Sequence, residues 1–237
     1  MKPLEIKGFI DLSLVDWDGK VSAVIFLPGC NFRCPFCYNS TIVLRPEQLP
    51  TIPFKRIKHY LTEKRGWLDG VVITGGEPTI HTELPHLCRQ IKELGLLVKL
   101  DTNGTNPQMI EELIAQGLAD YIAMDIKAPL TIESYSRATG VTMEKLLNEV
   151  KRTLKFLMDN HVDYEFRTTL VRTVHGVKDL KQMHRSLQGC RKYVLQNFKG
   201  DVETLDPKFK EIKPFSQLEM ERFLSLTRQT LPNASTR

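Results

Sequence analysis

The stretch GVVITGGEPTIHTELPHLCRQIKELGLLVKLDTNG, residues 70–104, contains one complete strand–helix–strand repeat. It starts with a short apolar run at 70–75 and continues through 83–95, where apolar residues recur with helical periodicity. Gly95 stands where helices commonly end, and a second apolar run follows at 96–104. Two buried strands joined through one helix favour a right-handed crossover and a parallel sheet.

The same alternation extends in both directions along the chain. Strand-like runs recur at 21–28, 120–127, 162–171 and 192–198, and helix-like segments at 54–66, 106–117, 142–160, 177–187 and about 214–230. This gives six strand–helix units, too few for a closed eight-fold barrel. We therefore expect an α/β fold, a partial (β/α)6 TIM-like barrel. Residues 5–16 pair with the 21–28 run in an N-terminal β-hairpin, about 5–27, with a tight turn at Asp18-Gly19.

The 237 residues are expected to form a single domain, 1–237, with its core at about 20–200 and a flexible tail at 231–237. The net charge of +5 is modest and its lysines and arginines are scattered, which argues against nucleic-acid binding. No run approaches the ~20 apolar residues of a membrane helix, and the N-terminus does not resemble a signal peptide. We expect a cytoplasmic protein that does not associate with membranes.

Three of the five cysteines, Cys30, Cys34 and Cys37, fall within eight residues. An odd number in such a cluster argues against a disulfide framework and for metal ligation. Closed zinc and electron-transfer sites normally have four protein ligands, so three thiolates favour an iron–sulfur cluster with one open iron. Two alternatives stay open: a zinc site completed by Cys88, Cys190 or a histidine, and three core cysteines close together by chance. Cys88 and Cys190 are themselves interpreted as core residues, and the six histidines as ordinary.

Polar motifs follow the predicted strands where each one ends. In parallel α/β sheets chemistry gathers at the carboxyl ends of strands, although each motif alone could simply form a turn or a helix cap. These strand-end residues are Gly75, Gly76, Glu77, Pro78, Asp101, Thr102, Asn103, Asp125, Lys127, Arg167, Gln196 and Asn197.

The order of Cys-x3-Cys-x2-Cys and Gly-Gly-Glu-Pro resembles the radical S-adenosylmethionine (SAM) superfamily, over residues of about 20–200. The resemblance implies a partial barrel of the radical SAM type and a [4Fe-4S] cluster on Cys30, Cys34 and Cys37. It also implies that SAM binds the open iron and is cleaved reductively to a 5'-deoxyadenosyl radical.

Roles for the remaining residues follow from the same resemblance. Phe36 is expected near the adenine, and the loop of Gly75, Gly76, Glu77 and Pro78 beside the methionine ammonium. A monovalent cation or SAM is expected beside Asp101, Thr102 and Asp125, with Asn103 also binding cofactor. Lys127 is assigned to the SAM carboxylate or the substrate peptide and counted with the catalytic cysteines. SAM contacts are expected from Arg167 and Asn197.

The stretch FLPGCNFRCPFCYN, 26–39, resembles activating proteins of anaerobic ribonucleoside-triphosphate reductase. This implies hydrogen abstraction from a glycine of a partner protein, with electrons from a flavodoxin- or ferredoxin-type donor. Residues 41–70 contain no cysteine, unlike activases that carry extra clusters there. The alternatives are a pyruvate formate-lyase-type activase, a small-molecule enzyme such as 7-carboxy-7-deazaguanine synthase, and a non-enzymatic module with a closed four-ligand metal site.

Overall fold

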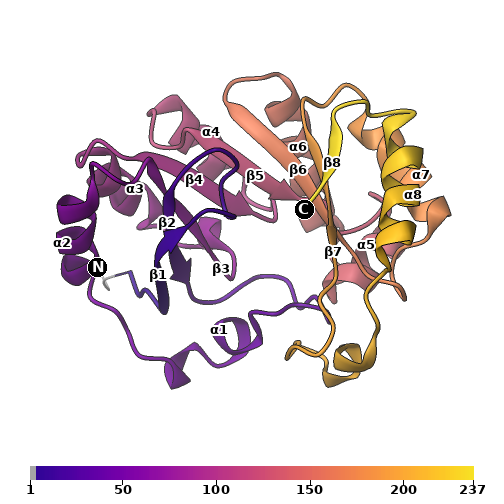
Figure 1. Ribbon diagram of the computed structural model, residues 1–237, viewed down its shortest axis with the longest axis horizontal. Helices are drawn as coiled ribbons and strands as arrows, with labels where there is room; N and C mark the ends of the chain where they lie inside the picture. Colours follow the sequence, from indigo (N-terminus) through magenta and orange to yellow (C-terminus); the bar gives the residue numbers. More distant parts are fainter. Residues whose placement is uncertain (1–3) are drawn as a thin grey trace. The chain divides into compact units, whose positions relative to one another are not determined.

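The structure is a computed structural model that describes residues 4–237 (Figure 1). Within these residues eight strands form one sheet whose order follows the chain. The strands are β1 (Gly8–Ser13), β2 (Ser22–Leu27), β3 (Gly70–Gly75), β4 (Leu97–Thr102), β5 (Tyr121–Asp125), β6 (Asp163–Leu170), β7 (Tyr193–Asn197) and β8 (Ala234–Thr236). The helices are α1 (Ser40–Leu44), α2 (Phe54–Lys64), α3 (Leu84–Lys92), α4 (Pro107–Ala115), α5 (Ile132–Thr139), α6 (Glu144–Met158), α7 (Val177–Leu187) and α8 (Gln217–Arg228).

Strands β2 to β7 are each followed by at least one helix, which confirms the six predicted strand–helix units. β2 pairs with β3, β3 with β4, β6 with β7 and β7 with β8, all in parallel, whereas β1 is antiparallel to β2. β1 and β8 stand at opposite ends of this order, and the described residues contain no pairing between them. The fold is therefore the α/β incomplete barrel predicted from the sequence, with its N-terminal hairpin.

The chain divides into two compact units. Unit 1 comprises residues up to 31, 41–102 and 106–123, and unit 2 comprises 32–40, 103–105 and 124–237. In unit 1, Val24 and Val72 of neighbouring strands are fully buried and pack with Trp17. In unit 2, Phe166 and Tyr193 from β6 and β7 are fully buried. Strands this apolar on both faces are typical of a parallel sheet covered by helices.

Helices pack one apolar stripe and leave the rest exposed. In α3 the buried residues are Leu84, Leu87, Cys88 and Ile91, at the i, i+3, i+4 and i+7 spacing of a single helix face. Cys88 is fully buried in that stripe, so it is a core residue as predicted. None of the described helices is long and apolar enough to cross a membrane.

The connection between β1 and β2 differs from the tight hairpin turn predicted at Asp18-Gly19. Gly19 does adopt a left-handed φ of 72°, in a turn closed by a backbone hydrogen bond to the Trp17 carbonyl (3.1 Å). Strand pairing stops at Ser13 and Ser22, however, which leaves residues 14–21 as a longer loop. Burial of the Trp17 indole in the core explains this loop, because a two-residue turn could not bring the ring back onto the sheet.

The prediction of a flexible tail at 231–237 is wrong. Ala234–Thr236 forms β8, and the backbone N–H of Arg237 donates to the carbonyl of Leu195 in β7 (3.0 Å). The Arg237 guanidinium also pairs with the buried Glu165 carboxylate at 3.3 Å. Hydrogen bonding to a neighbouring strand and a buried ion pair order a segment that has no strand-like sequence pattern of its own.

Candidate functional site

In unit 1 the Gly-Gly-Glu-Pro loop hydrogen-bonds to the backbone that leads into Cys30. The N–H of Gly76 donates to the carbonyl of Leu27 (2.9 Å). The N–H of Glu77 donates to the carbonyl of Gly29 (2.8 Å), the residue directly before Cys30. The loop after β3 therefore lies directly against the backbone that leads into the cysteine loop.

The Glu77 carboxylate is buried and holds the turn that follows β3. Its Oε1 accepts hydrogen bonds from the Thr79 N–H (3.0 Å) and the Thr79 hydroxyl (2.6 Å). The hydroxyl of Thr102, at the end of β4, donates to the same oxygen at 2.8 Å. Pro78 begins the short 3₁₀ helix Pro78–Ile80. Glu77 and Thr102, two residues predicted for the site, are thus directly bonded, and Glu77 links the ends of two neighbouring strands.

Asp101 precedes Thr102 on β4 and lies close to a buried lysine. Its Oδ1 is 3.8 Å from the Nζ of Lys99, and the Lys99 ammonium also donates to the backbone carbonyl of Asp16. The Lys99 side chain is almost wholly enclosed and lies 5.6 Å from the centroid of the Tyr121 ring. Asp101 therefore faces a fixed positive charge within unit 1, a neighbour that the sequence did not indicate.

In unit 2, Cys34 and Cys37 lie in one tight turn that a late segment of the chain holds in place. The N–H of Cys37 donates to the carbonyl of Cys34 at 3.0 Å. The carbonyl of Cys37 accepts from the N–H of Leu205 (3.0 Å), and that of Pro35 from the N–H of Asp206 (2.9 Å). Burial raises the pKa of the Cys37 thiol. The turn is thus hydrogen-bonded within itself and to the segment between β7 and α8.

Three charged residues predicted from strand ends form one cluster in unit 2. Asp125 Oδ1 accepts from Arg167 Nε at 2.9 Å, and its Oδ2 accepts from Lys127 Nζ at 2.8 Å. Burial disfavours the charged carboxylate, yet Arg167 and Lys127 outweigh it and hold the pKa of Asp125 at about 2. Burial alone would lower the pKa of the Lys127 ammonium. The negative charges of Asp125 and of a Cys34 thiolate outweigh burial and raise that pKa. The cluster carries one net positive charge beside the cysteine turn.

His175 joins this cluster to the cysteine turn, although the sequence had indicated no role for it. Its Nδ1 accepts from the Val171 N–H (3.0 Å), so its Nε2 carries the proton and donates to the Lys127 carbonyl (2.8 Å). Burial lowers the pKa of His175, which keeps the ring neutral at pH 7. The ring also packs edge-on to Phe36, with centroids 6.4 Å apart. Only the three-dimensional structure could reveal this contact set.

Three further predicted residues of unit 2 take part in local structure. Phe36 is buried, and Phe209 lies with its ring centroid 6.2 Å away. The Oδ1 of Asn103 accepts from the N–H and the hydroxyl of Thr105. The Asn197 amide is bonded on both sides to Phe215, donating to its carbonyl (2.6 Å) and accepting from its N–H (3.1 Å). Asn197 thus positions the segment that leads into α8.

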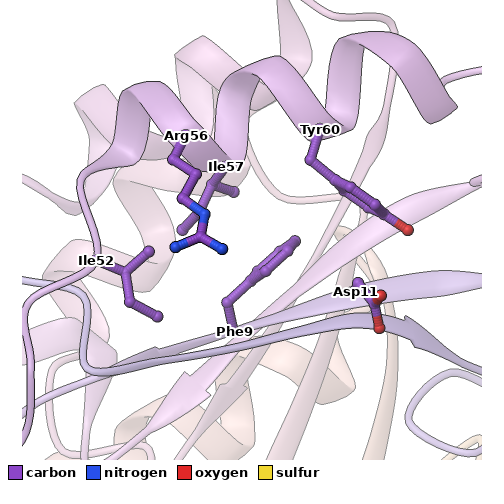
Figure 2. A pocket seen from close by; sticks show the side chains of 6 residues that line it. All are labelled: Phe9, Asp11, Ile52, Arg56, Ile57 and Tyr60. Atoms are coloured by element: carbon purple, nitrogen blue, oxygen red, sulfur yellow. The ribbon is translucent and has the colours of Figure 1, made fainter.

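A separate cavity of about 450 Å³ in unit 1 contains none of the predicted site residues. It is lined by Phe9, Asp11, Ile52, Arg56, Ile57 and Tyr60. Figure 2 shows the Phe9 ring of β1 facing α2, with Arg56 on one side and Tyr60 on the other. The Phe9 and Tyr60 rings meet edge to face at 5.6 Å.

The donor set fits an iron–sulfur cluster. All five cysteines are free thiols, and three of them share one loop. Soft thiolates are the usual ligands of such clusters, in which each cysteine binds a different iron. In the described chain, no three histidine, cysteine, aspartate or glutamate side chains form a group that could hold a single metal ion.

The fold is an incomplete α/β barrel in which β2 leads into a loop with three cysteines. The family model of the radical SAM superfamily matches residues 24–188, and the chain belongs to that superfamily. Over its whole length it is 32% identical to a protein of Methanocaldococcus jannaschii named "Putative glycyl-radical enzyme activating enzyme", of which 97% is covered. It is also 36% identical to the 7-carboxy-7-deazaguanine synthase of Aquifex aeolicus over 62% of this chain and 60% of that protein.

Solved structures share the fold at low sequence identity. Streptococcus suis SuiB bound to the precursor peptide SuiA gives a TM-score of 0.69 at 17% identity, over 90% of this chain. This chain covers only 48% of SuiB. QueE from Escherichia coli gives a TM-score of 0.56 at 16% identity, over 99% of this chain and 93% of that one. Membership of the superfamily implies SAM and a [4Fe-4S] cluster as cofactors.

Proposed function

We propose that this radical SAM enzyme activates a glycyl radical enzyme by removing hydrogen from one of its glycines, and that anaerobic ribonucleoside-triphosphate reductase is that partner. The main support is the extent of the likeness to the Methanocaldococcus jannaschii protein, which spans the whole chain. That match includes β1 and the segment beyond residue 188, both outside the family model. A flavodoxin- or ferredoxin-type protein supplies the electron.

When bound, the cluster and SAM supply a 5'-deoxyadenosyl radical that can take hydrogen from a glycine. Cys30, Cys34 and Cys37 hold the cluster as thiolates in this proposal. Because burial raises the pKa of Cys37, binding of iron would release a proton from that thiol. The structure of unit 1 supports a role for Glu77 in fixing the Cys30 loop through backbone bonds.

Lys127 and Arg167 are proposed to bind anionic groups of SAM or of the substrate. Asp125 neutralises only one of these two positive charges, and the remaining one suits the binding of a carboxylate. Asp125 orients both side chains, because one carboxylate oxygen accepts from each of them. A monovalent cation is proposed beside Asp101 and Thr102 in unit 1. A cation at Asp125 would instead have to share a carboxylate oxygen with Arg167 or Lys127, because each oxygen already accepts from one of them.

The second candidate is a synthase of the 7-carboxy-7-deazaguanine type. It is favoured by the 36% identity to the Aquifex aeolicus enzyme. Such an enzyme would act on a pterin-like small molecule with magnesium and would need no partner protein. The two candidates therefore differ in whether SAM cleavage leaves a radical on a protein.

The test is anaerobic reconstitution with iron and sulfide, reduction, and addition of SAM with the candidate reductase. The activase proposal predicts a glycyl doublet in electron paramagnetic resonance spectra and one equivalent of 5'-deoxyadenosine per radical. SAM cleavage without a protein radical, together with turnover of the pterin substrate, would transfer the assignment to the synthase. Cys34→Ala should abolish both signals, and the matched variant Cys88→Ala should retain them.

A further inference from the structure

Unit 2 contains a cavity of about 220 Å³ between α7 and α8, on which the proposed function does not draw. It is lined by Lys181, His184, Arg185, Leu226, Gln229 and Thr230. Lys181, His184 and Arg185 come from α7, and the other three from the end of α8 and the residues just beyond it. The two helices lie side by side in Figure 1.

Every polar side chain of this lining is a cation or can donate a hydrogen bond, and none is a carboxylate. Lys181 and Arg185 are four residues apart on α7, so their charges lie on one helix face, where like charges repel by about 0.2–0.5 kcal/mol. Among the described residues, neither of them forms an ion pair. The unit 1 cavity of Figure 2 differs, because there Asp11 shares the lining with Arg56.

His184 adds an independent observation. Its side chain is 2% exposed, and its Nε2 is buried with no hydrogen-bond partner in the described chain. The ring packs edge-on against Tyr193, with centroids 6.4 Å apart. Leaving a buried nitrogen unpaired costs about 1–3 kcal/mol. Because this atom is enclosed, a ligand in the cavity removes that cost only if the ring turns its Nε2 toward the cavity.

We propose that this cavity binds an oxyanion of the phosphate class. Lys181 and Arg185 neutralise its charge, and His184, Gln229 and Thr230 donate hydrogen bonds to its oxygens. The volume lies below the roughly 300–1,000 Å³ of typical small-molecule sites, so it suits one tetrahedral group and not a whole cofactor. Free phosphate and the phosphate of a nucleotide share this chemistry.

Binding is tested by calorimetric titration of the reconstituted full-length protein with inorganic phosphate in a chloride buffer of fixed ionic strength. We expect saturable one-to-one binding that weakens at least ten-fold in Lys181→Gln/Arg185→Gln. The matched control is Lys151→Gln/Lys155→Gln, which removes two exposed lysines with the same spacing on α6. The control should change the affinity less than two-fold. Absence of saturable binding, or equal weakening in both double variants, overturns the proposal.

The histidine gives a second readout that does not depend on the surface charges. In protein labelled with ¹⁵N-histidine, the His184 ring resonances, assigned with His184→Gln, should shift during the phosphate titration with the same dissociation constant. Unmoved resonances at saturation would overturn the site. Titration with adenosine monophosphate identifies the source: ten-fold tighter binding than phosphate identifies a nucleotide, and equal or weaker binding identifies free phosphate.

Discussion

A Cβ placed on Gly76 would lie 1.6 Å from the carbonyl oxygen of Gly29. No heavy atom can occupy that position, so only glycine allows the loop after β3 to meet the turn before Cys30. Backbone hydrogen bonds from Gly76 and Glu77 depend on the same close contact. The position of the first cysteine is therefore linked to a residue almost fifty positions later in the chain.

Gly76→Ala should consequently prevent normal cluster assembly. The added methyl group must push the Gly29 backbone away and shift Cys30 with it, so we expect iron and sulfide content after reconstitution to fall several-fold. Gly66→Ala is the matched control, because nothing lies within 4 Å of a Cβ at that position. Full iron loading of Gly76→Ala would show that the loop tolerates the displacement.

Each of Cys30, Cys34 and Cys37 replaced by Ala should abolish SAM cleavage, whereas Cys88→Ala and Cys190→Ala should preserve it. Burial raises the pKa of Cys88 to about 12 and that of Cys190 to about 11, and it also raises the pKa of Cys37. The two control cysteines differ from Cys37 in position, because neither lies on the loop of residues 30–37. We expect Cys88→Ala to lower the free energy of unfolding by about 1 kcal/mol, since it removes one buried group. Loss of the cluster in either control would make that residue a ligand.

Asp125→Asn should destabilise unit 2 by about 1–3 kcal/mol, because it removes the charge to which both Arg167 and Lys127 are hydrogen-bonded. Urea denaturation of the protein without its iron–sulfur cluster measures this change in the free energy of unfolding. Asp163→Asn removes an aspartate from an exposed pair with Arg191, and should cost no more than about 1 kcal/mol. Equal effects of the two substitutions would mean that the Asp125 cluster is no more than a surface ion pair.

The start of α8 should weaken in acid. Hydrogen bonds from Arg172, and then from Ser216, hold the pKa of Glu219 at about 2, below its ordinary value of 4.5. A carboxylate with a lowered pKa contributes its full stability above its unfolded value and loses it as the pH falls through the folded one. The difference in unfolding free energy between the protein and Glu219→Gln, at low salt, should therefore shrink between pH 4.5 and 2. A constant difference across that range would contradict the assigned role of this ion pair.

The sequence predicted the repeating part of the fold because its signals are local. β3 is recognisable as a short apolar run and α3 from its apolar periodicity, and Gly95 stands just past the end of that helix. Helix α5 was missed although its signals are present: Thr131 accepts the N–H of Ser134, and Gly140 ends the helix with a φ of 68°. The helix is only eight residues long, so periodicity gave little indication of it.

The site was predictable as a set of residues but not as a set of contacts. Strand ends indicated Asp125, Lys127 and Arg167 separately, yet the ion cluster joins residues 42 positions apart. Motif spacing cannot show that Asn197 binds the Phe215 backbone, or that His175 contacts both Lys127 and Phe36. These contacts depend on the register of neighbouring strands, which only the folded sheet determines.

The bonds from Leu205 and Asp206 to the cysteine turn bear on when the protein becomes ready for metal. On the ribosome, the three cysteines emerge long before these two residues have been translated. The nascent turn lacks the partners that fix the carbonyls of Pro35 and Cys37. Iron and sulfide that arrive during translation would thus reach a cysteine loop that lacks its final conformation. The hydrogen bonds that hold the cysteine turn are complete only after most of the polypeptide has been synthesised.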